Sequence, residues 1–237
     1  MNPNQWSCPT SVLSSDTITM SHGSGGRLSA KLFQEVFAKH YPSPELLAQG
    51  DSAVLEWNSE DRLVISTDAF VVQPLSFPGG DIGSLCVYGT VNDLAVQGAL
   101  PIALTIAWVI EEGMRLEQLN QLAQSVGKAA RDCSVRIVAG DTKVVERGRG
   151  HGCYITTTGV GKLQTSLNLA PDRIAAGDRI LISGPIGDHG MAIMSQRAGL
   201  DFQPHLCSDC APVHRMTRDL VIDCRGSKSC EIRHEAG

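Results

Sequence analysis

Apolar residues recur at helical spacing in three long stretches of the chain. After a glycine cluster, the run Leu28–His40 places apolar residues three and four positions apart, which predicts a helix that ends at Tyr41. The stretch Leu116–Asp132 has the same spacing on one face and predicts a second, amphipathic helix. A third helix is predicted to begin after Asp81, a candidate N-cap, and to end at Gly98.

Shorter apolar stretches between these helices have the composition of β-strands. They are rich in β-branched residues and are bounded by Gly, Pro, Asn or Asp. Because strands and helices alternate irregularly as far as Leu163, the pattern predicts an α+β domain. The predicted strands are 52–57, 62–67, 102–110, 135–139 and 153–160.

The pattern divides residues 1–223 into four parts. Residues 1–17 are predicted to be a flexible leader, 18–163 the α+β domain, and 164–178 a linker that contains Asn, Pro, Gly and Asp. A strand at 179–183, and a helix after Gly187-Asp188-His189-Gly190, predict that a second, α/β domain begins in 179–223. Since domains usually have about 100–150 residues, this second domain is expected to be incomplete.

Composition and charge exclude several classes of protein. The net charge of −5 gives no basic footprint, so no nucleic-acid partner is expected. No stretch approaches about 18 consecutive apolar residues, and the N-terminus lacks a basic region followed by an apolar one, so neither a membrane span nor a secretory signal is predicted. A cytoplasmic location is therefore expected.

The eight cysteines fit reduced thiols better than disulfides in a chain of this length without an export signal. Cys86, Cys133 and Cys153 lie in apolar segments and are interpreted as small buried side chains. Cys207 and Cys210 form a CxxC motif, for which zinc binding is a weakly supported alternative because no well-spaced second pair accompanies it.

Four aspartates lie in short runs of small or polar residues. They are Asp51 in GDSA, Asp68 in STDAF, Asp93 in VNDLA and Asp141 in GDTK. Placed just beyond strand ends, such carboxylates project into the crevice where loops gather, and several together would suit Mg²⁺, which prefers oxygen ligands and bridges phosphates. Each one alone has a plainer explanation as a turn or capping residue.

Asp93 carries more information than the other three. It lies inside the third predicted helix, where aspartate is unfavourable, so its carboxylate is expected to have a partner. A surface cation would be the ordinary partner, and a metal ion or a phosphate-bound water the functional one.

A glycine-rich loop precedes the first predicted helix. Gly23, Gly25 and Gly26 would allow backbone N–H groups to approach a phosphate, and the following helix N-terminus favours an anion. The loop lacks the spacing of a P-loop and the preceding strand of a Rossmann turn, so a structural turn is the alternative. Lys143 follows Asp141 by two residues and would supply a cation to a phosphate, or would be a solvated surface lysine.

Six motifs occur in an order that resembles one family. HGSGG, GDSA, STDAFVVQPLSFPGGDIG, GTVNDLAVQGALP, EEG and GDTKVVERG together resemble the HypE family of hydrogenase maturation proteins, which is PurM-like, from about Thr17 to Asp223. Selenophosphate synthetase would carry a reactive Cys or selenocysteine in the glycine loop, which here has none. Thiamine-phosphate kinase is similar in the aspartate-containing turns but not in the FPGG or GDTKVV stretches.

The resemblance implies a fold, a reaction and partners. It implies a PurM-like N-terminal domain that binds ATP and Mg²⁺ and forms a homodimer with ATP near the two-fold interface, followed by an α/β C-terminal domain. A HypF-like carbamoyltransferase would load a carbamoyl group on a C-terminal cysteine, ATP would drive its dehydration to thiocyanate, and the cyano group would pass to iron on a HypC–HypD complex. By resemblance, the catalytic positions are Asp93 and Lys143, the nucleotide positions are Gly23, Gly25, Gly26, Asp51, Asp68, Asn92, Asp141 and Thr142, and the metal positions are Asp51, Asp68, Asp93 and Asp141.

The end of the chain departs from the family pattern. It lacks the terminal cysteine, and residues 224–237 have no apolar period. With suitable codons, the same tail read two bases later encodes a peptide similar to the segment that follows in the family, so 224–237 is predicted to be a frameshifted tail. Two other functions stay open: a different PurM-like ATP-dependent enzyme, and a truncated, non-catalytic paralogue that dimerises.

Overall fold

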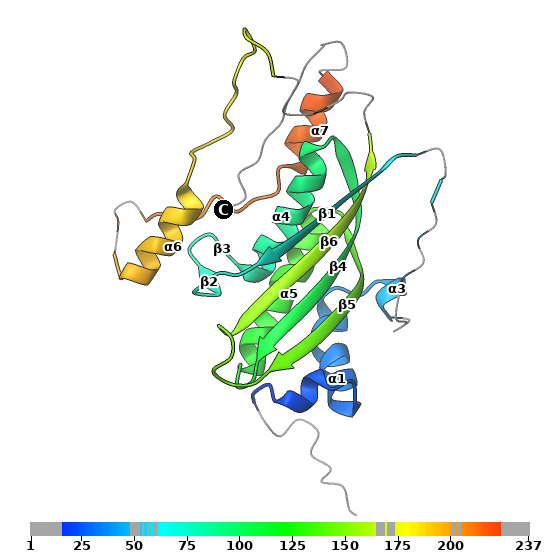
Figure 1. The fold of residues 1–237 in the computed structure, drawn as a ribbon, viewed down its shortest axis with the longest axis vertical. Coiled ribbons are helices and arrows are strands. Elements are labelled where there is room, and N and C mark those ends of the chain that lie inside the picture. The colour runs from blue at the N-terminus through cyan, green and yellow to red at the C-terminus, as the bar shows by residue number, and fades with distance from the viewer. Residues whose placement is uncertain are drawn as a thin grey trace, which may run out of the picture.

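The computed structural model describes residues 16–47, 53, 55, 57–58, 61–164, 169, 174–200, 202 and 205–223. Asp51, most of the predicted leader, half of the predicted strand 52–57 and the whole predicted tail lie outside these ranges. The described part has a curved sheet with its helices on one face (Figure 1). Across the described residues, no helix has both the length and the apolar character needed to cross a bilayer.

Four strands form the main sheet, in the order β1-β6-β4-β5. Strand β6 pairs antiparallel with β1 and β4, whereas β4 and β5 are parallel because a helix carries the chain back between them. The strands predicted at 62–67, 102–110, 135–139 and 153–160 are all present, and each is longer than predicted. The bounds are β1 (Leu63–Phe70), β4 (Ala99–Glu111), β5 (Arg136–Val145) and β6 (Cys153–Leu163), with a small separate pair, β2 (Ser76–Phe77) and β3 (Gly80–Asp81).

Two long helices cover one face of this sheet. Helix α4 (Ile82–Val96) begins after the predicted cap, because the Asp81 carboxylate accepts a hydrogen bond of 2.8 Å from the Ser84 N–H. Gly98 adopts a φ of 77° just beyond its end, which fits the predicted stop. Helix α5 (Leu116–Asp132) has the predicted bounds and turns its apolar stripe inward. The hydrophobic core lies between these helices and the sheet.

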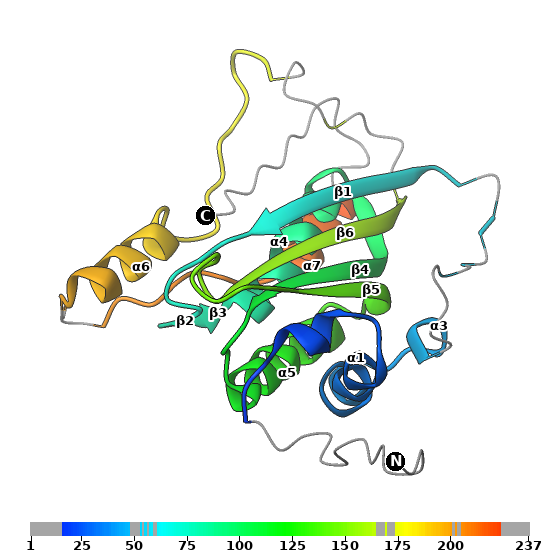
Figure 2. The same cartoon turned by 60° about the horizontal axis from the view of Figure 1, so that its bottom comes forward.

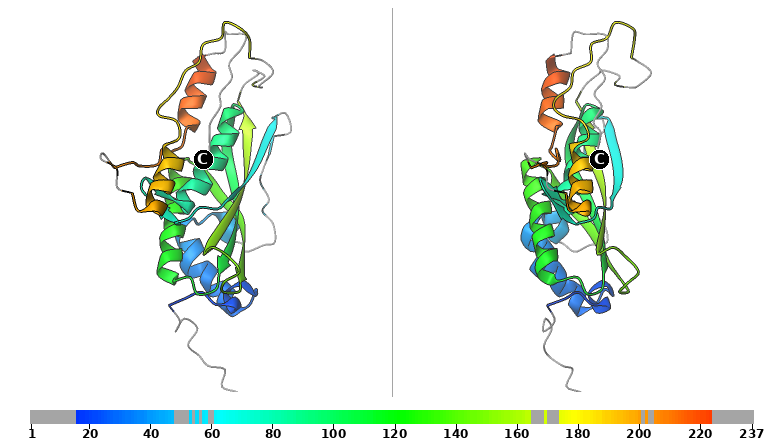
Figure 3. Two further views of the ribbon diagram at one scale, coloured as in Figure 1. Left: turned by 60° about the vertical axis from the view of Figure 1, so that its left-hand side comes forward. Right: turned by 90° about the vertical axis from the view of Figure 1, so that its left-hand side faces the viewer.

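The opposite face of the sheet carries no helix in the described part of the chain (Figure 3). It presents the alternate residues of each strand, among them Leu63 and Ile65, whose exposed fractions are 48% and 66%. An uncovered sheet face with apolar side chains is typical of a surface that binds another protein.

The N-terminal segment packs beside edge strand β5 and helix α5 (Figure 2). The predicted single helix is present as a continuous run with one π-helical turn in its middle. The π-helical segment widens the turn around Phe33 and Phe37. The elements are η1 (Met20–Gly23), α1 (Arg27–Leu32), η2 (Phe33–Phe37), α2 (Ala38–His40) and α3 (Pro44–Leu47).

The predicted strand at 179–183 is wrong. Ile180 and Leu181 are 88% and 82% exposed, and no described segment pairs with them. A strand forms only where a neighbour accepts its backbone hydrogen bonds, which an apolar run does not ensure. Helix α6 (Asp188–Ala198) begins directly after Gly187, three residues earlier than predicted, because Gly187 takes the left-handed conformation at its N-cap.

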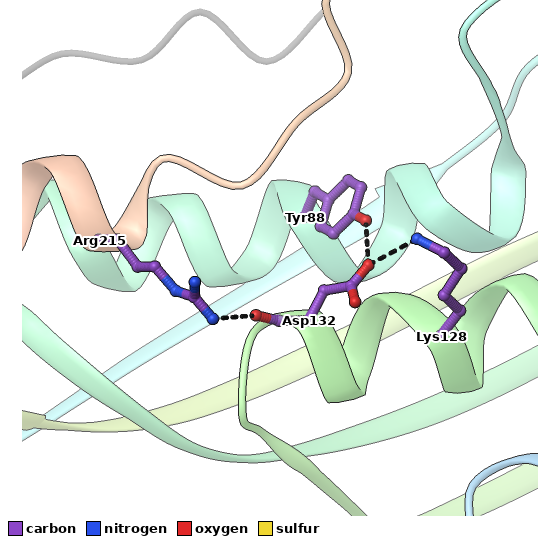
Figure 4. Close-up of polar contacts among 4 residues, drawn as sticks. All are labelled: Tyr88, Lys128, Asp132 and Arg215. Atoms are coloured by element: carbon purple, nitrogen blue, oxygen red, sulfur yellow. Dashed lines mark hydrogen bonds and ion pairs between the residues drawn. The ribbon is translucent and has the colours of Figure 1, made fainter.

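Helix α7 (His214–Asp223) packs against α4, far from its own place in the sequence. Asp132, the last residue of α5, joins the three helices (Figure 4). Its carboxylate accepts hydrogen bonds from Lys128 at 2.8 Å and from the Tyr88 hydroxyl at 3.3 Å, and its carbonyl accepts one from Arg215 at 3.3 Å. The Lys128 hydrogen bond lowers the pKa of Asp132, and burial raises that of Tyr88 to about 12. At neutral pH, Asp132 is therefore ionised and Tyr88 is protonated, so the tyrosine hydroxyl can donate to the carboxylate.

Candidate functional site

Asp68 and Asp93 form a close pair of carboxylates between strand β1 and helix α4. Asp93 accepts a 2.8 Å hydrogen bond from the Ser66 hydroxyl, and Ser66 lies two residues before Asp68 on the same side of β1. Burial and the neighbouring Asp93 carboxylate raise the pKa of Asp68. Within the described residues, no lysine or arginine lies within ion-pair distance of Asp93, so the surface ion pair considered for it is not formed there.

Gly89, one turn before Asp93, lets the Phe70 ring pack closely against α4 beside this pair. A Cβ on Gly89 would lie 2.8 Å from the Phe70 ring and 3.8 Å from an Asp68 oxygen. A larger residue there would force the Phe70 ring against the carboxylates. Two adjacent carboxylates are a suitable anchor for a divalent cation.

Asp68→Asn is expected to stabilise the metal-free protein at pH 7.5. Because the pKa of Asp68 is raised in the folded protein, folding favours the protonated carboxyl. Ionisation of Asp68 therefore lowers the free energy of unfolding as the pH rises through that pKa. Below the unfolded pKa of about 3.9 the loss is absent, so the gain from Asn should vanish there. Urea unfolding in EDTA at pH 7.5 and pH 3.5 measures this. Asp219→Asn, at an exposed carboxylate, is the control, and an equal gain at both pH values would contradict the prediction.

Asp141, Thr142 and Lys143 lie on edge strand β5, next to the glycine loop. The Lys143 ammonium is 3.6 Å from the Asp141 carboxylate, and both side chains are 65% exposed. The loop is held tightly against the strand, since a Cβ on Gly23 would lie 2.5 Å from the Val144 nitrogen. The strand and the loop thus bring together residues more than a hundred positions apart.

A cavity of about 200 Å³ opens between this loop and the sheet. Its rim includes the exposed Gly25, Asp141 and Lys143, and its interior is aromatic. Phe37, Tyr41 and Trp108 are buried there and Phe33 is half-buried. Apolar spacing predicted that Phe33 and Phe37 lie on the buried face of a helix, and Tyr41 was predicted only to end it. Nothing in the sequence distinguishes an aromatic residue that fills the core from one that lines a cavity.

The predicted convergence of aspartates on one point is not formed within the described chain. Asp68 pairs in register with Thr157, whereas Asp141 lies in the adjacent register with Ala107 and Thr156. The two carboxylates therefore point to opposite faces, from strands that are three spacings, about 14 Å, apart. Among described residues, no group of three His, Cys, Asp or Glu side chains could hold a metal ion.

The expected position of these aspartates at strand ends is also wrong. Asp68 and Asp141 lie inside β1 and β5, because pairing with β6 and β4 continues to Phe70 and Val145. Strand length depends on the neighbouring strand, which the local sequence does not show. Asp51 lies outside the described residues.

Asn92 is buried on α4, whereas Gly26 is exposed beside α1. The Asn92 side chain is buried, donates to the Ala211 carbonyl at 3.0 Å and accepts from the Val213 N–H at 2.8 Å. It thereby attaches the segment before α7 to α4, while its predicted contact with a nucleotide stays a prediction. Gly26 is exposed at the N-cap of α1, and its predicted contact with a phosphate stays a prediction.

The buried thiols are packing residues, as predicted. Cys86, Cys133 and Cys153 are buried, and burial raises the pKa of Cys133 and Cys153 to about 12. Cys210 is half-buried and its pKa is raised to about 11 by burial. The described chain places no metal-binding group around it, so the zinc alternative has no support there.

A second cavity, of about 670 Å³, lies at the end of the sheet beside the EEG motif. Glu111 accepts hydrogen bonds from the backbone N–H groups of Gly148 at 2.5 Å and Gly152 at 2.9 Å, and these hydrogen bonds lower its pKa. Its carboxylate thus holds the loop after β5 in place, a role that the sequence did not indicate.

Comparisons with known proteins place this fold. Residues 49–163 match the family described as "AIR synthase related protein, N-terminal domain". The chain is 46% identical to carbamoyl dehydratase HypE of Bradyrhizobium diazoefficiens over 204 residues, which are 86% of this chain and 59% of that protein. It is 39% identical to the HypE of Escherichia coli K12, over 86% of this chain and 63% of that one.

Solved structures agree. A crystal structure of hydrogenase maturation protein HypE in complex with ATP matches with a TM-score of 0.84 at 44% identity, over 87% of this chain and 61% of that one. A HypE–HypF complex matches with a TM-score of 0.67 at 43% identity, over 83% and 62% of the two chains. The chain thus spans about three fifths of the length of the relatives that it matches. Over that shared length, it belongs to the HypE family and has the AIR synthase-related fold.

Proposed function

We propose that this chain binds ATP with Mg²⁺ and supports the ATP-dependent dehydration of a carbamoyl group. The observation that carries the proposal is the placement of Lys143, Asp141 and the glycine loop around one cavity rim. A cation and several backbone N–H groups at one rim suit a polyphosphate. A HypE structure that holds ATP, at 44% identity, supports the same ligand.

The reaction follows from the chemistry of an amide. The carbamoyl oxygen attacks the γ-phosphorus of ATP, the bond to the bridging oxygen breaks, and ADP leaves. One proton leaves the nitrogen when the oxygen is phosphorylated. The O-phosphorylated group then loses inorganic phosphate and the second proton from nitrogen, and a C≡N bond remains on sulfur. Lys143 would hold phosphate oxygens, and Asp68 and Asp93 would hold the magnesium ion, which would neutralise the charge that develops on the phosphoryl group.

We propose a homodimer that buries the uncovered sheet face. Asp68 and Asp93 lie at one edge of the sheet and Lys143 at the other, too far apart for a single phosphoryl group. A two-fold arrangement that packs two uncovered sheet faces together would bring β5 of one copy toward β1 of the other, with Asp68 and Asp93 on the helix-covered side of that β1. The exposed apolar side chains on that face would then be buried.

Partners are proposed from the relatives. A HypF-like carbamoyltransferase would supply the carbamoyl group, as the HypE–HypF complex suggests. A HypC–HypD complex would receive the cyano group. A truncated, dimerising paralogue without turnover is the competing function.

Lys143→Ala is expected to weaken ATP binding by roughly 10- to 100-fold, since a charge-assisted hydrogen bond contributes about 1.5–3 kcal/mol. Titration calorimetry with Mg-ATP measures the dissociation constant. Lys39→Ala removes an exposed lysine from helix α2 and is the matched control. Equal affinities for the two variants would contradict the phosphate site, and binding without hydrolysis in the wild type would favour the non-catalytic paralogue.

A further inference from the structure

His22 opens the glycine loop and is buried, unlike the residues that follow it. Its side chain is 2% exposed, whereas Ser24, Gly25 and Gly26 are exposed. It lies in η1, which packs against β5 and α1. The reaction described above does not use this histidine, so its burial needs another explanation.

Two hydrogen-bonding groups of Thr19 face one nitrogen of the His22 ring. Nδ1 lies 3.1 Å from the Thr19 nitrogen and 3.0 Å from its hydroxyl oxygen. A backbone N–H can only donate, so Nδ1 accepts and the proton of the neutral ring is on Nε2. The His22 N–H in turn donates to the Thr19 carbonyl at 3.0 Å. The two residues therefore close the turn from both sides.

The other nitrogen of the ring has no such partner. Nε2 is buried and makes no hydrogen bond to a described residue. A buried donor without a partner is destabilising, so an apolar side chain of similar volume would serve packing better than histidine does. What the ring contributes is the Nδ1 acceptor, and through it the shape of the turn.

The turn sets where the glycine loop lies. Gly23 follows directly and touches β5, because a Cβ on it would meet the backbone nitrogen of Val144. Further along, the Gly25 N–H donates to the Ser29 hydroxyl of α1 at 2.9 Å. The loop is thus held at both ends, by the buried His22 at its start and by Ser29 on its solvent side.

We propose that His22 is the positioning residue of the glycine loop: through Nδ1 it keeps the turn from Thr19 to Gly23 closed, and the loop stays against β5 beside Lys143. It acts through the loop and needs no contact with the phosphates. Loss of the Nδ1 acceptor would release the Thr19 N–H, and the loop would then leave the rim at which a polyphosphate binds. The proposal rests on the proposed function, because it presumes that this rim binds the phosphates of ATP.

Acid should open the turn. A proton on Nδ1 turns this acceptor into a donor, which can bind the Thr19 carbonyl but leaves the Thr19 N–H without a partner. Burial lowers the pKa of His22 below its ordinary value of 6.5, and a hydrogen bond with the Thr19 backbone opposes this as the smaller effect. The loop is therefore positioned at neutral pH and released as the pH falls through that pKa. The charged side chains on the segments around η1 are Arg27, Lys31, Glu112, Arg136, Asp141 and Lys143. None of them is a cause of this shift.

Two substitutions separate the acceptor from the packing. His22→Asn keeps an acceptor at the place of Nδ1 and cannot titrate, whereas His22→Leu fills a similar volume without one. At pH 7.5, His22→Leu is expected to weaken Mg-ATP and inorganic tripolyphosphate by about tenfold each, and His22→Asn by less than about twofold, since only leucine loses the hydrogen bonds at Nδ1. Titration calorimetry measures the dissociation constants. His189→Asn, at a half-buried histidine of α6 whose pKa burial also lowers, is the matched control and should bind like the wild type.

A pH series tests the ring itself. Protonation of the phosphates weakens binding to every variant alike, so the ratio of the wild-type dissociation constant to that of His22→Asn isolates the histidine. Between pH 7.5 and pH 5 this ratio is expected to rise by at least about twofold, with its midpoint at the His22 pKa measured by NMR. The His189→Asn variant should show the same rise as the wild type.

The outcomes distinguish the positioning of the loop from the proposed function. If the wild type binds Mg-ATP and His22→Leu binds it equally well, or if His22→Asn is as weak as His22→Leu, only the positioning proposal is overturned. A ratio that does not change with pH overturns it too. If the wild type binds neither Mg-ATP nor tripolyphosphate, both proposals are overturned. Thermal melts show whether a His22 variant has unfolded, and if His22→Leu has, the His22→Asn affinity and the pH series decide.

Discussion

Asp93→Asn is expected to lower ATP hydrolysis by at least about 100-fold, while the protein stays folded. The substitution removes the charge that would help to hold magnesium on the terminal phosphates, and preorganised charge at a phosphoryl group is commonly the largest catalytic contribution. The asparagine carbonyl can still accept the hydrogen bond from Ser66, so the local packing is retained.

Phosphate release in the presence and absence of Mg²⁺ measures this effect. Asp219→Asn makes the same change at an exposed carboxylate of α7 and should leave hydrolysis unchanged. The Asn variant should also be no less stable than the wild type, because removal of one charge relieves the repulsion of Asp68. Undiminished magnesium-dependent hydrolysis by the Asp93 variant would place the metal site elsewhere.

Gly127→Ala is expected to destabilise the fold by about 3 kcal/mol, which would lower the melting temperature by roughly 10 °C. Helix α5 passes so close to the end of α2 that a Cβ on Gly127 would lie 2.2 Å from the His40 carbonyl oxygen. That oxygen also accepts a hydrogen bond from Arg131 at 3.1 Å, so α2 cannot retreat without breaking it. Alanine would therefore separate the two helices.

The matched control is Gly190→Ala in helix α6. A Cβ there meets no atom within 4 Å, so alanine should be neutral or slightly stabilising through its higher helix propensity. Thermal unfolding followed by circular dichroism measures both variants. A Gly127→Ala melting temperature equal to that of Gly190→Ala would show that the helix contact is looser than the structure indicates.

The local sequence alone determined the long helices and their ends. The apolar stripe of α5 and the capping residues of α4 involve contacts within a few residues, so their bounds agree with the prediction to within a residue or so. It also determined the family, since the motifs from HGSGG to GDTKVV occur in the family order and the comparisons confirm the resemblance.

The tertiary structure decided where the chemistry lies. Strand lengths depend on pairing between distant segments, so Asp68 and Asp141 lie inside strands instead of at their ends, and on opposite faces. The apolar run 179–183 has no described segment to pair with, so it is exposed and forms no strand. Asp68 and Asp141, two members of the candidate cluster seen in the sequence, are separated by the width of the sheet. The aromatic cavity beside Trp108 exists because an N-terminal helix packs on β5, a non-local contact that no spacing of residues reveals.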